Sequence, residues 1–167
     1  MTTKCVRTSP ALLLAVLFVA CGYNTTTRTA KDIKSIHVPF FNNQTSEPNL
    51  EITVTESVIL YLIEDNTLRV ADESDADAVL DGSIVEFQNR PFSFNLDLNA
   101  EEYRVVVRVR VTLYNRRTNE PIWSDRVLVG DGSYFIDKPD ANTFNDAVAE
   151  SIREITERIL NLTVQDW

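Results

Sequence analysis

Residues 103–115, YRVVVRVRVTLYN, alternate between apolar and polar side chains. A period of two is that of a β-strand with one face in the core, and such clean alternation favours an antiparallel sheet. We expect this strand to be the middle one of three in a meander, with its neighbours at 79–89 and 122–129. Asn119, in the turn before the third strand, can adopt the left-handed conformation that a tight turn needs.

Two further segments have helical periodicity. The stretch that ends before Asn66 has an apolar residue every four positions, at Leu50, Val54, Val58 and Leu62, and Ile59 and Ile63 are expected to widen this stripe. A second helix is expected over about 140–162, with the favourable pair Glu154 and Arg158 off its apolar stripe of Phe144, Ala147, Val148, Ile152, Ile155, Ile159 and Leu162. Short strands are expected at 33–38 and 67–71. The predicted fold is α+β, with two helices packed on one face of a four- to five-stranded mixed, largely antiparallel sheet.

The N-terminus has the features of an export signal. Lys4 and Arg7 precede an unbroken apolar run at 11–20. Ten helical residues span about 15 Å, half of the hydrocarbon thickness of a bilayer, so residues 1–20 are predicted to be a removable signal peptide. The run ends at Cys21 in a pattern that resembles the bacterial lipobox, in which the cysteine is acylated. The alternative is an ordinary signal peptide cut nearby, which leaves a free cysteine. Residues 21–32 are then a lipidated N-terminus and tether, and 33–167 a single domain.

Composition argues against most enzyme chemistries and against nucleic-acid binding. The chain of 167 residues has a net charge of −9, which becomes −11 once Lys4 and Arg7 are removed, whereas nucleic-acid binders carry a basic excess. The domain after Cys21 has no thiol, and its only histidine, His37, is interpreted as a strand-end packing residue. The acidic cluster Asp72, Glu73, Asp75, Asp77 and Asp81 lacks the glycine and distal glutamate of a calcium loop, so a solvated turn is favoured. No catalytic residue, metal site or cofactor is predicted, and the chain is interpreted as a binding or assembly module.

The chain has five motifs in a fixed order: Cys-Gly-Tyr after the lipobox, IKSIHVPFFNNQTSEPNLE, ADAVLDGSIVEF, AEEYRVVVRVRVTLYNRRTNEPIW and an amphipathic C-terminal helix. In this order they resemble the LptE family of lipopolysaccharide-assembly lipoproteins. The Pro-Phe-x-Asn-x-Thr loop is less specific, because it also occurs in outer-membrane lipoproteins of curli secretion and of penicillin-binding-protein activation. The resemblance implies a protein anchored by lipid on the periplasmic side of the outer membrane. It also implies a non-enzymatic role in which the protein plugs and helps to assemble an LptD-like β-barrel and binds lipopolysaccharide.

An acidic protein needs a local basic patch to bind an anionic lipid, because distant charge is screened beyond about 8–10 Å. Antiparallel alternation places Arg90, Arg104 and Lys138 at one end of the sheet, and Arg108 and Arg110 extend the arginine-bearing face of the strand. Between Arg90 and Arg104, apolar side chains stand at alternate positions: Phe92, Phe94, Leu96 and Leu98. Three interpretations remain open for this region: a lipopolysaccharide-binding patch, a surface that contacts the barrel, or ordinary surface and hairpin residues folded onto the core.

A second function class fits the same sequence. An outer-membrane lipoprotein of this kind could instead regulate a cell-wall synthase or form part of a secretion complex. The partner that co-purifies distinguishes the two hypotheses.

Overall fold

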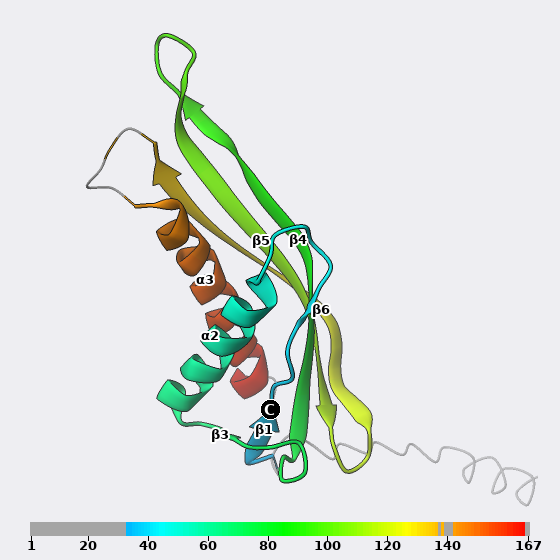
Figure 1. Cartoon of the computed structure of the whole chain (residues 1–167). Helices are drawn as coiled ribbons and strands as arrows, with labels where there is room; N and C mark the ends of the chain where they lie inside the picture. Colours follow the sequence, from blue (N-terminus) through cyan, green and yellow to red (C-terminus); the bar gives the residue numbers. More distant parts are fainter. Residues whose placement is uncertain (1–32, 137, 139–141, 166–167) are drawn as a thin grey trace, which may run out of the picture.

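The computed structural model describes residues 33–136, 138 and 142–165 (Figure 1). Six strands form one sheet in the order β3-β1-β4-β5-β6, with β2 pairing separately with β4. The two helices, α2 (Leu50–Asp65) and α3 (Phe144–Gln165), lie on the same side of the sheet (Figure 1). The α+β prediction is therefore confirmed, and the predicted signal peptide and tether lie outside the described residues.

Three long antiparallel strands form the body of the sheet: β4 (Ala78–Phe94), β5 (Ala100–Asn115) and β6 (Glu120–Phe135). The odd residues of β5 face the helices and are at most 1% exposed from Val105 to Leu113. Asn119 has a φ of 55°, as predicted for the turn before β6. Alternation in the sequence thus identified the strand that passes through the centre of the core.

Both outer strands of the meander are longer than predicted, and each extension has a physical reason. Proline removes an N–H from a strand, yet β4 continues through Pro91. This is possible because β1 and β2, which pair with the other edge of β4, reach only residues 78–84 of it. In β6, a Cβ on Gly130 or Gly132 would lie 1.9 Å from the Ser151 carbonyl oxygen or 2.2 Å from that of Ala147. These glycines allow α3 to lie directly on the strand.

The N-terminal strands are short and parallel to their neighbours. β1 (Ser35–His37) lies between β3 (Arg69–Val70) and the start of β4. β2 (Asn42–Asn43) pairs with β4 within the stretch that the sequence predicts as a loop, and it raises the strand count to six. The rest of that stretch has no regular structure beyond bends and turns. A strand of two residues is too short to produce a periodic pattern in the sequence, so it could not be predicted.

The helices bury the predicted stripes. In α2, Leu50, Val54, Val58 and Leu62 are buried, and Asn66 ends the helix in the left-handed conformation. The prediction for Ile63 is wrong, because its side chain is 56% exposed on the opposite face of α2. In α3, the buried residues include Ala147, Ile152, Ile155 and Ile159. The helix begins at Phe144 because Thr143 and Asp146 bond each other's backbone N–H, which forms a capping box.

Candidate functional site

One end of the β4–β5 pair projects beyond the rest of the domain. β6 ends at Phe135, opposite Glu102, while β4 and β5 continue to a turn at residues 95–99. Figure 1 shows this hairpin reaching past α3 and past the end of β6. No described helix covers it.

The projecting hairpin carries four large apolar side chains in contact with solvent. Their exposed fractions are 50% for Phe92, 57% for Phe94, 103% for Leu96 and 84% for Leu98. These values contradict the interpretation that the hairpin folds onto the core. Exposed apolar surface concentrated at one tip is typical of an interaction site.

The turn that presents the leucines is ordered by Asn95. Its side-chain oxygen accepts hydrogen bonds from the N–H groups of Asp97 at 3.0 Å and Asn99 at 2.9 Å. Leu98 has a φ of 61°, a left-handed conformation that costs an ordinary side chain roughly 1–2 kcal/mol. Strain of this kind persists only where the surrounding structure imposes it, and here it holds a leucine out in solvent.

Cationic side chains lie at the base of the hairpin, where the sequence predicted them to meet. Arg90 and Arg104 are direct cross-strand partners. The Arg104 guanidinium lies 3.6 Å from the centroid of the Phe92 ring, which a bulge in β4 brings over it. Lys138 lies 4.1 Å from the centroid of the Phe135 ring and 3.2 Å from the Glu101 carboxylate. Arg104 and Phe92 are therefore in contact, and Lys138 lies at the same end of the sheet.

Two of these cations retain unused capacity for an anion. Nε of Arg104 is buried without a hydrogen-bond acceptor, and its nearest carboxylate, that of Asp131, is 3.8 Å away. Arg90 has no ion-pair partner among the described residues and faces the like charge of Arg104. Like charges on directly opposite residues destabilise a strand pair, so an anion between them would relieve the repulsion.

The other two predicted arginines lie away from this cluster. Arg108 is bound to the Glu86 carboxylate at 2.7 Å, so its charge is compensated. Arg110 is exposed opposite Ser83, about 20 Å from Arg104 along the strand. The structure thus places Arg90, Arg104 and Lys138 at the same end of the sheet as the apolar hairpin and separates Arg108 and Arg110 from them. We call the first group, with Phe92, Phe94, Leu96 and Leu98, the tip cluster.

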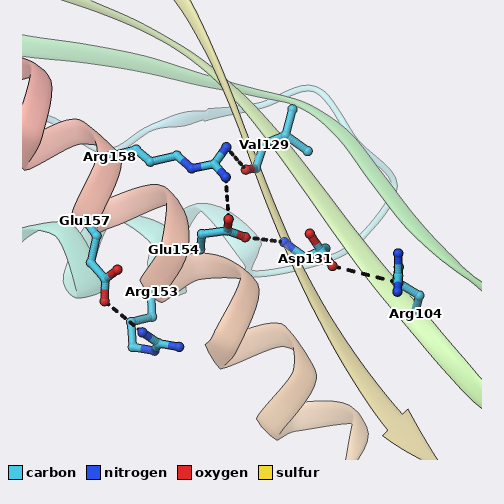
Figure 2. Close-up of polar contacts among 7 residues, drawn as sticks. All are labelled: Arg104, Val129, Asp131, Arg153, Glu154, Glu157 and Arg158. Carbon is cyan, nitrogen blue, oxygen red and sulfur yellow. Dashed lines mark hydrogen bonds and ion pairs between the residues drawn. The ribbon is translucent and has the colours of Figure 1, made fainter.

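Sequence reasoning missed the acidic partners of the tip cluster. Glu101 and Asp131 come from β5 and β6 and neutralise part of its charge. Asp131 also takes part in a second set of contacts, in which Glu154 and Arg158 of α3 reach the backbone of β6 (Figure 2). The i,i+4 spacing predicted the Glu154–Arg158 ion pair, which is present, but not its contact with a strand.

The acidic turn and His37 have structural partners at the opposite end of the sheet. Asp77 accepts hydrogen bonds from the N–H groups of Lys34 and Ser35 at 3.0 and 3.1 Å and from the Ser35 hydroxyl. The Lys34 bond is the largest cause that lowers the pKa of Asp77 below its usual value. The Nδ1 atom of His37 lies 3.2 Å from the Ala71 carbonyl oxygen. Asp77 is therefore a tie between β1 and β4 and not merely a solvated carboxylate.

The residues that the structure describes contain no helix long and apolar enough to cross a membrane. They also contain no group of three or more His, Cys, Asp or Glu side chains placed to hold a metal ion.

Comparison with known proteins gives one family and several folds of the same kind. The family model LptE, described as lipopolysaccharide-assembly, matches residues 33–165. No curated protein sequence matches the chain.

Solved structures from other bacteria have similar folds at low sequence identity. A Xanthomonas campestris protein has a TM-score of 0.61 at 10% identity, covering 79% of this chain and 84% of its own. A putative lipoprotein from Caulobacter crescentus has a TM-score of 0.54 at 18% identity, covering 79% and 90%. The PelC dodecamer from Paraburkholderia phytofirmans has a TM-score of 0.52 at 15% identity, covering 78% and 87%. At these identities the likeness concerns the fold alone.

Proposed function

The chain belongs to the LptE family of lipopolysaccharide-assembly proteins, and we propose that it acts without catalysis, as an outer-membrane lipoprotein. In this proposal it plugs an LptD-like β-barrel, helps to assemble it and binds lipopolysaccharide on its way to the outer leaflet. The tip cluster is the observation that supports lipid binding most directly. It combines Arg90, Arg104 and Lys138 with exposed Phe and Leu side chains, a chemistry that matches an amphiphile with phosphates and acyl chains.

We assign different parts of the tip cluster to the two partners. The cations at the base are suited to the phosphates of lipopolysaccharide, since Arg90 has no ion-pair partner among the described residues and Arg104 is partly exposed with its ion-pair partner 3.8 Å away. Leu96 and Leu98 at the end are suited to an apolar surface, either the acyl chains or the barrel wall.

The N-terminus supplies the anchor in this proposal. Residues 1–20 are removed, Cys21 is acylated, and 21–32 tether the domain at 33–167 to the inner leaflet. Several acyl chains hold a protein on a membrane, whereas a single chain gives only marginal binding. Cys21→Ala should therefore release the protein from membranes. If that variant still fractionates with the outer membrane at high salt, the barrel is the anchor and the lipid is not.

Charge reversal tests the lipid-binding site. Arg90→Glu together with Lys138→Glu should weaken lipopolysaccharide binding by the purified chain at least about tenfold, because two attractive contacts become repulsive. The matched control reverses Arg116 and Arg117, two exposed arginines in the turn at the opposite end of the sheet. Circular dichroism checks that both variants keep the fold.

The two variants have the same change in net charge, so they separate a local site from general attraction. Weaker binding only in the Arg90 and Lys138 variant supports the site. Equal loss in both variants would mean that lipopolysaccharide responds to net charge, and no loss in either would exclude the tip cluster as its binding site.

Co-purification tests the partner. A large outer-membrane β-barrel recovered with the full chain supports the proposal, and Leu96→Asp with Leu98→Asp should reduce its recovery if the barrel contacts the tip. The alternative is a lipoprotein that regulates a cell-wall synthase or belongs to a secretion complex. Recovery of a peptidoglycan synthase, or of a ring of this chain like the dodecamer of PelC, would favour that alternative.

A further inference from the structure

On the outer edge of β6, two backbone groups form hydrogen bonds with charged side chains of α3. Arg158 donates a hydrogen bond from Nη1 to the Val129 carbonyl oxygen at 2.6 Å. Glu154 accepts one at Oε2 from the Asp131 N–H at 3.0 Å. Figure 2 shows both contacts, with Arg158 and Glu154 also bound to each other. In an antiparallel edge strand, alternate residues direct both polar groups away from the sheet, and Val129 and Asp131 belong to that outward set.

These contacts depend on the glycines of β6. A Cβ at Gly130 would meet the Ser151 carbonyl oxygen, and one at Gly132 would meet that of Ala147. Because α3 lies this close to the strand, the side chains of Glu154 and Arg158 can reach around to its edge. Other segments have different obstacles to pairing: Pro121 and a register shift beside Asp125 in β6, and the two-residue length of β3. The regular stretch from Val127 to Ser133 has none of these obstacles and has side-chain cover instead.

The two covered groups are complementary to themselves. They are a carbonyl and an N–H separated by two residues on one strand. When two such edges meet antiparallel about a two-fold axis at Gly130, the Val129 carbonyl of each copy faces the Asp131 N–H of the other. Asp131 then lies opposite Val129 and not opposite a second Asp131, so the pairing opposes no like charges directly.

We propose that the outer edge of β6 is a latent pairing surface for β6 of a second copy of this chain, and that Glu154 and Arg158 keep it closed. The pair occupies the same two hydrogen-bonding groups that self-pairing would use. Its removal exposes a ready-made strand edge without taking a side chain from the core, since Arg158 is exposed and Glu154 is partly exposed.

The test compares two double variants of the full chain purified in detergent. Glu154→Ala with Arg158→Ala opens the edge. Arg153→Ala with Glu157→Ala is the matched control, because it removes an i,i+4 ion pair of the same helix, with Nη1 and Oε1 2.8 Å apart (Figure 2). Among the described residues, this pair makes no hydrogen bond to a strand. Light scattering over a range of concentrations gives the mass, and hydrogen exchange gives the protection of the backbone at residues 127–133.

We expect the first variant to form dimers with a dissociation constant about tenfold or more below that of the wild type, and its amides at 127–133 to exchange more slowly as dimers form. The control should behave as the wild type does. A first variant that stays monomeric with a native circular dichroism spectrum would overturn the proposal, as would equal association of the control. If the double variant does not fold, Arg158→Ala alone frees the Val129 carbonyl, and a folded, strictly monomeric single variant would overturn the proposal as well.

Discussion

The two halves of the β4–β5 pair have the same backbone pairing but opposite surroundings. From Leu80 to Ile84 and from Val105 to Leu113, the side chains that face the helices are buried. Beyond Ser93, the side chains of Phe94, Leu96 and Leu98 stand in solvent, because β6 ends opposite Glu102 and neither described helix covers the tip (Figure 1). The comparison shows that apolar character alone does not assign a residue to the core. We infer that the covered half provides stability and that the projecting half provides binding.

The largest expected effect comes from truncating one leucine in each half. Leu80→Ala should lower the free energy of unfolding by about 2–5 kcal/mol, because it leaves a cavity under the helices. Leu96→Ala removes the same atoms from a fully exposed site and should change the free energy of unfolding by less than about 0.5 kcal/mol. Denaturant unfolding measures both variants. A comparable loss in Leu96→Ala would show that the hairpin is part of the core after all.

A smaller effect is expected at Asp77, which joins the start of β4 to β1 by hydrogen bonds in the covered half. Asp77→Asn should lower the free energy of unfolding by about 1–3 kcal/mol at neutral pH, since hydrogen bonds from Lys34 and Ser35 to a charged carboxylate are lost. The pKa of Asp77 is lowered in the folded state, first by the Lys34 N–H and further by Ser35 and Arg117, against the opposing effect of burial.

The sign of the pH dependence follows from that lowered pKa. The stabilisation by Asp77 is complete above the pKa of an unfolded aspartate, about 3.9, and is lost as the pH falls through the lower folded value. The difference between wild type and Asp77→Asn should therefore shrink in acid. If the difference in unfolding free energy stays constant down to about pH 2, the loss in Asp77→Asn comes from altered hydrogen-bond geometry and not from the lost charge.

A still smaller effect is expected at the border of the two halves. Phe92→Leu keeps an apolar side chain but removes the ring that lies over the Arg104 guanidinium. We expect a loss of about 0.5–1 kcal/mol in unfolding free energy, the usual worth of an exposed cation–π contact. A loss above about 2 kcal/mol would mean that Phe92 is a structural residue and that the boundary between the halves lies further out.

The smallest effect on stability is expected at Leu98. Leu98→Gly relieves the cost of the left-handed conformation but adds the entropy that glycine loses on folding, so the unfolding free energy should change by less than about 0.5 kcal/mol. Recovery of the proposed barrel partner should nevertheless fall, because the exposed apolar side chain is gone. Unchanged recovery would remove Leu98 from the binding surface.

The sequence predicts the parts of the fold that repeat a local pattern. Alternation located β5, four-residue spacing located the buried face of α2, and Asn66 and Asn119 marked the end of a helix and a turn. The ends of β4 and β6 were missed, because Pro91 and Gly130 normally stop a strand. Here the strands continue because of their surroundings. Pro91 lies where the outer edge of β4 is unpaired, and Gly130 lies against the backbone of α3.

The candidate site was predictable in position but not in detail. Antiparallel order sufficed to place Arg90, Arg104 and Lys138 at one end of the sheet. The pairing of Arg108 with Glu86 depends on a bulge in β4, and the contact of Phe92 with Arg104 depends on another. A bulge shifts register by one residue, which no periodic pattern in a single strand reveals.

The position of β1 has a consequence for the order in which the chain folds. β1 leads the described domain, yet both of its neighbours in the sheet are made later: β3 about thirty residues on and β4 about forty. By contrast, β4 pairs with β5 and β5 pairs with β6 across short turns, and such local pairing forms sooner than contacts between distant segments. β1 is thus the first strand of the described domain to be synthesised and among the last expected to be fixed. Until β4 has been made, β1 lacks one of the two strands that hold it in the sheet.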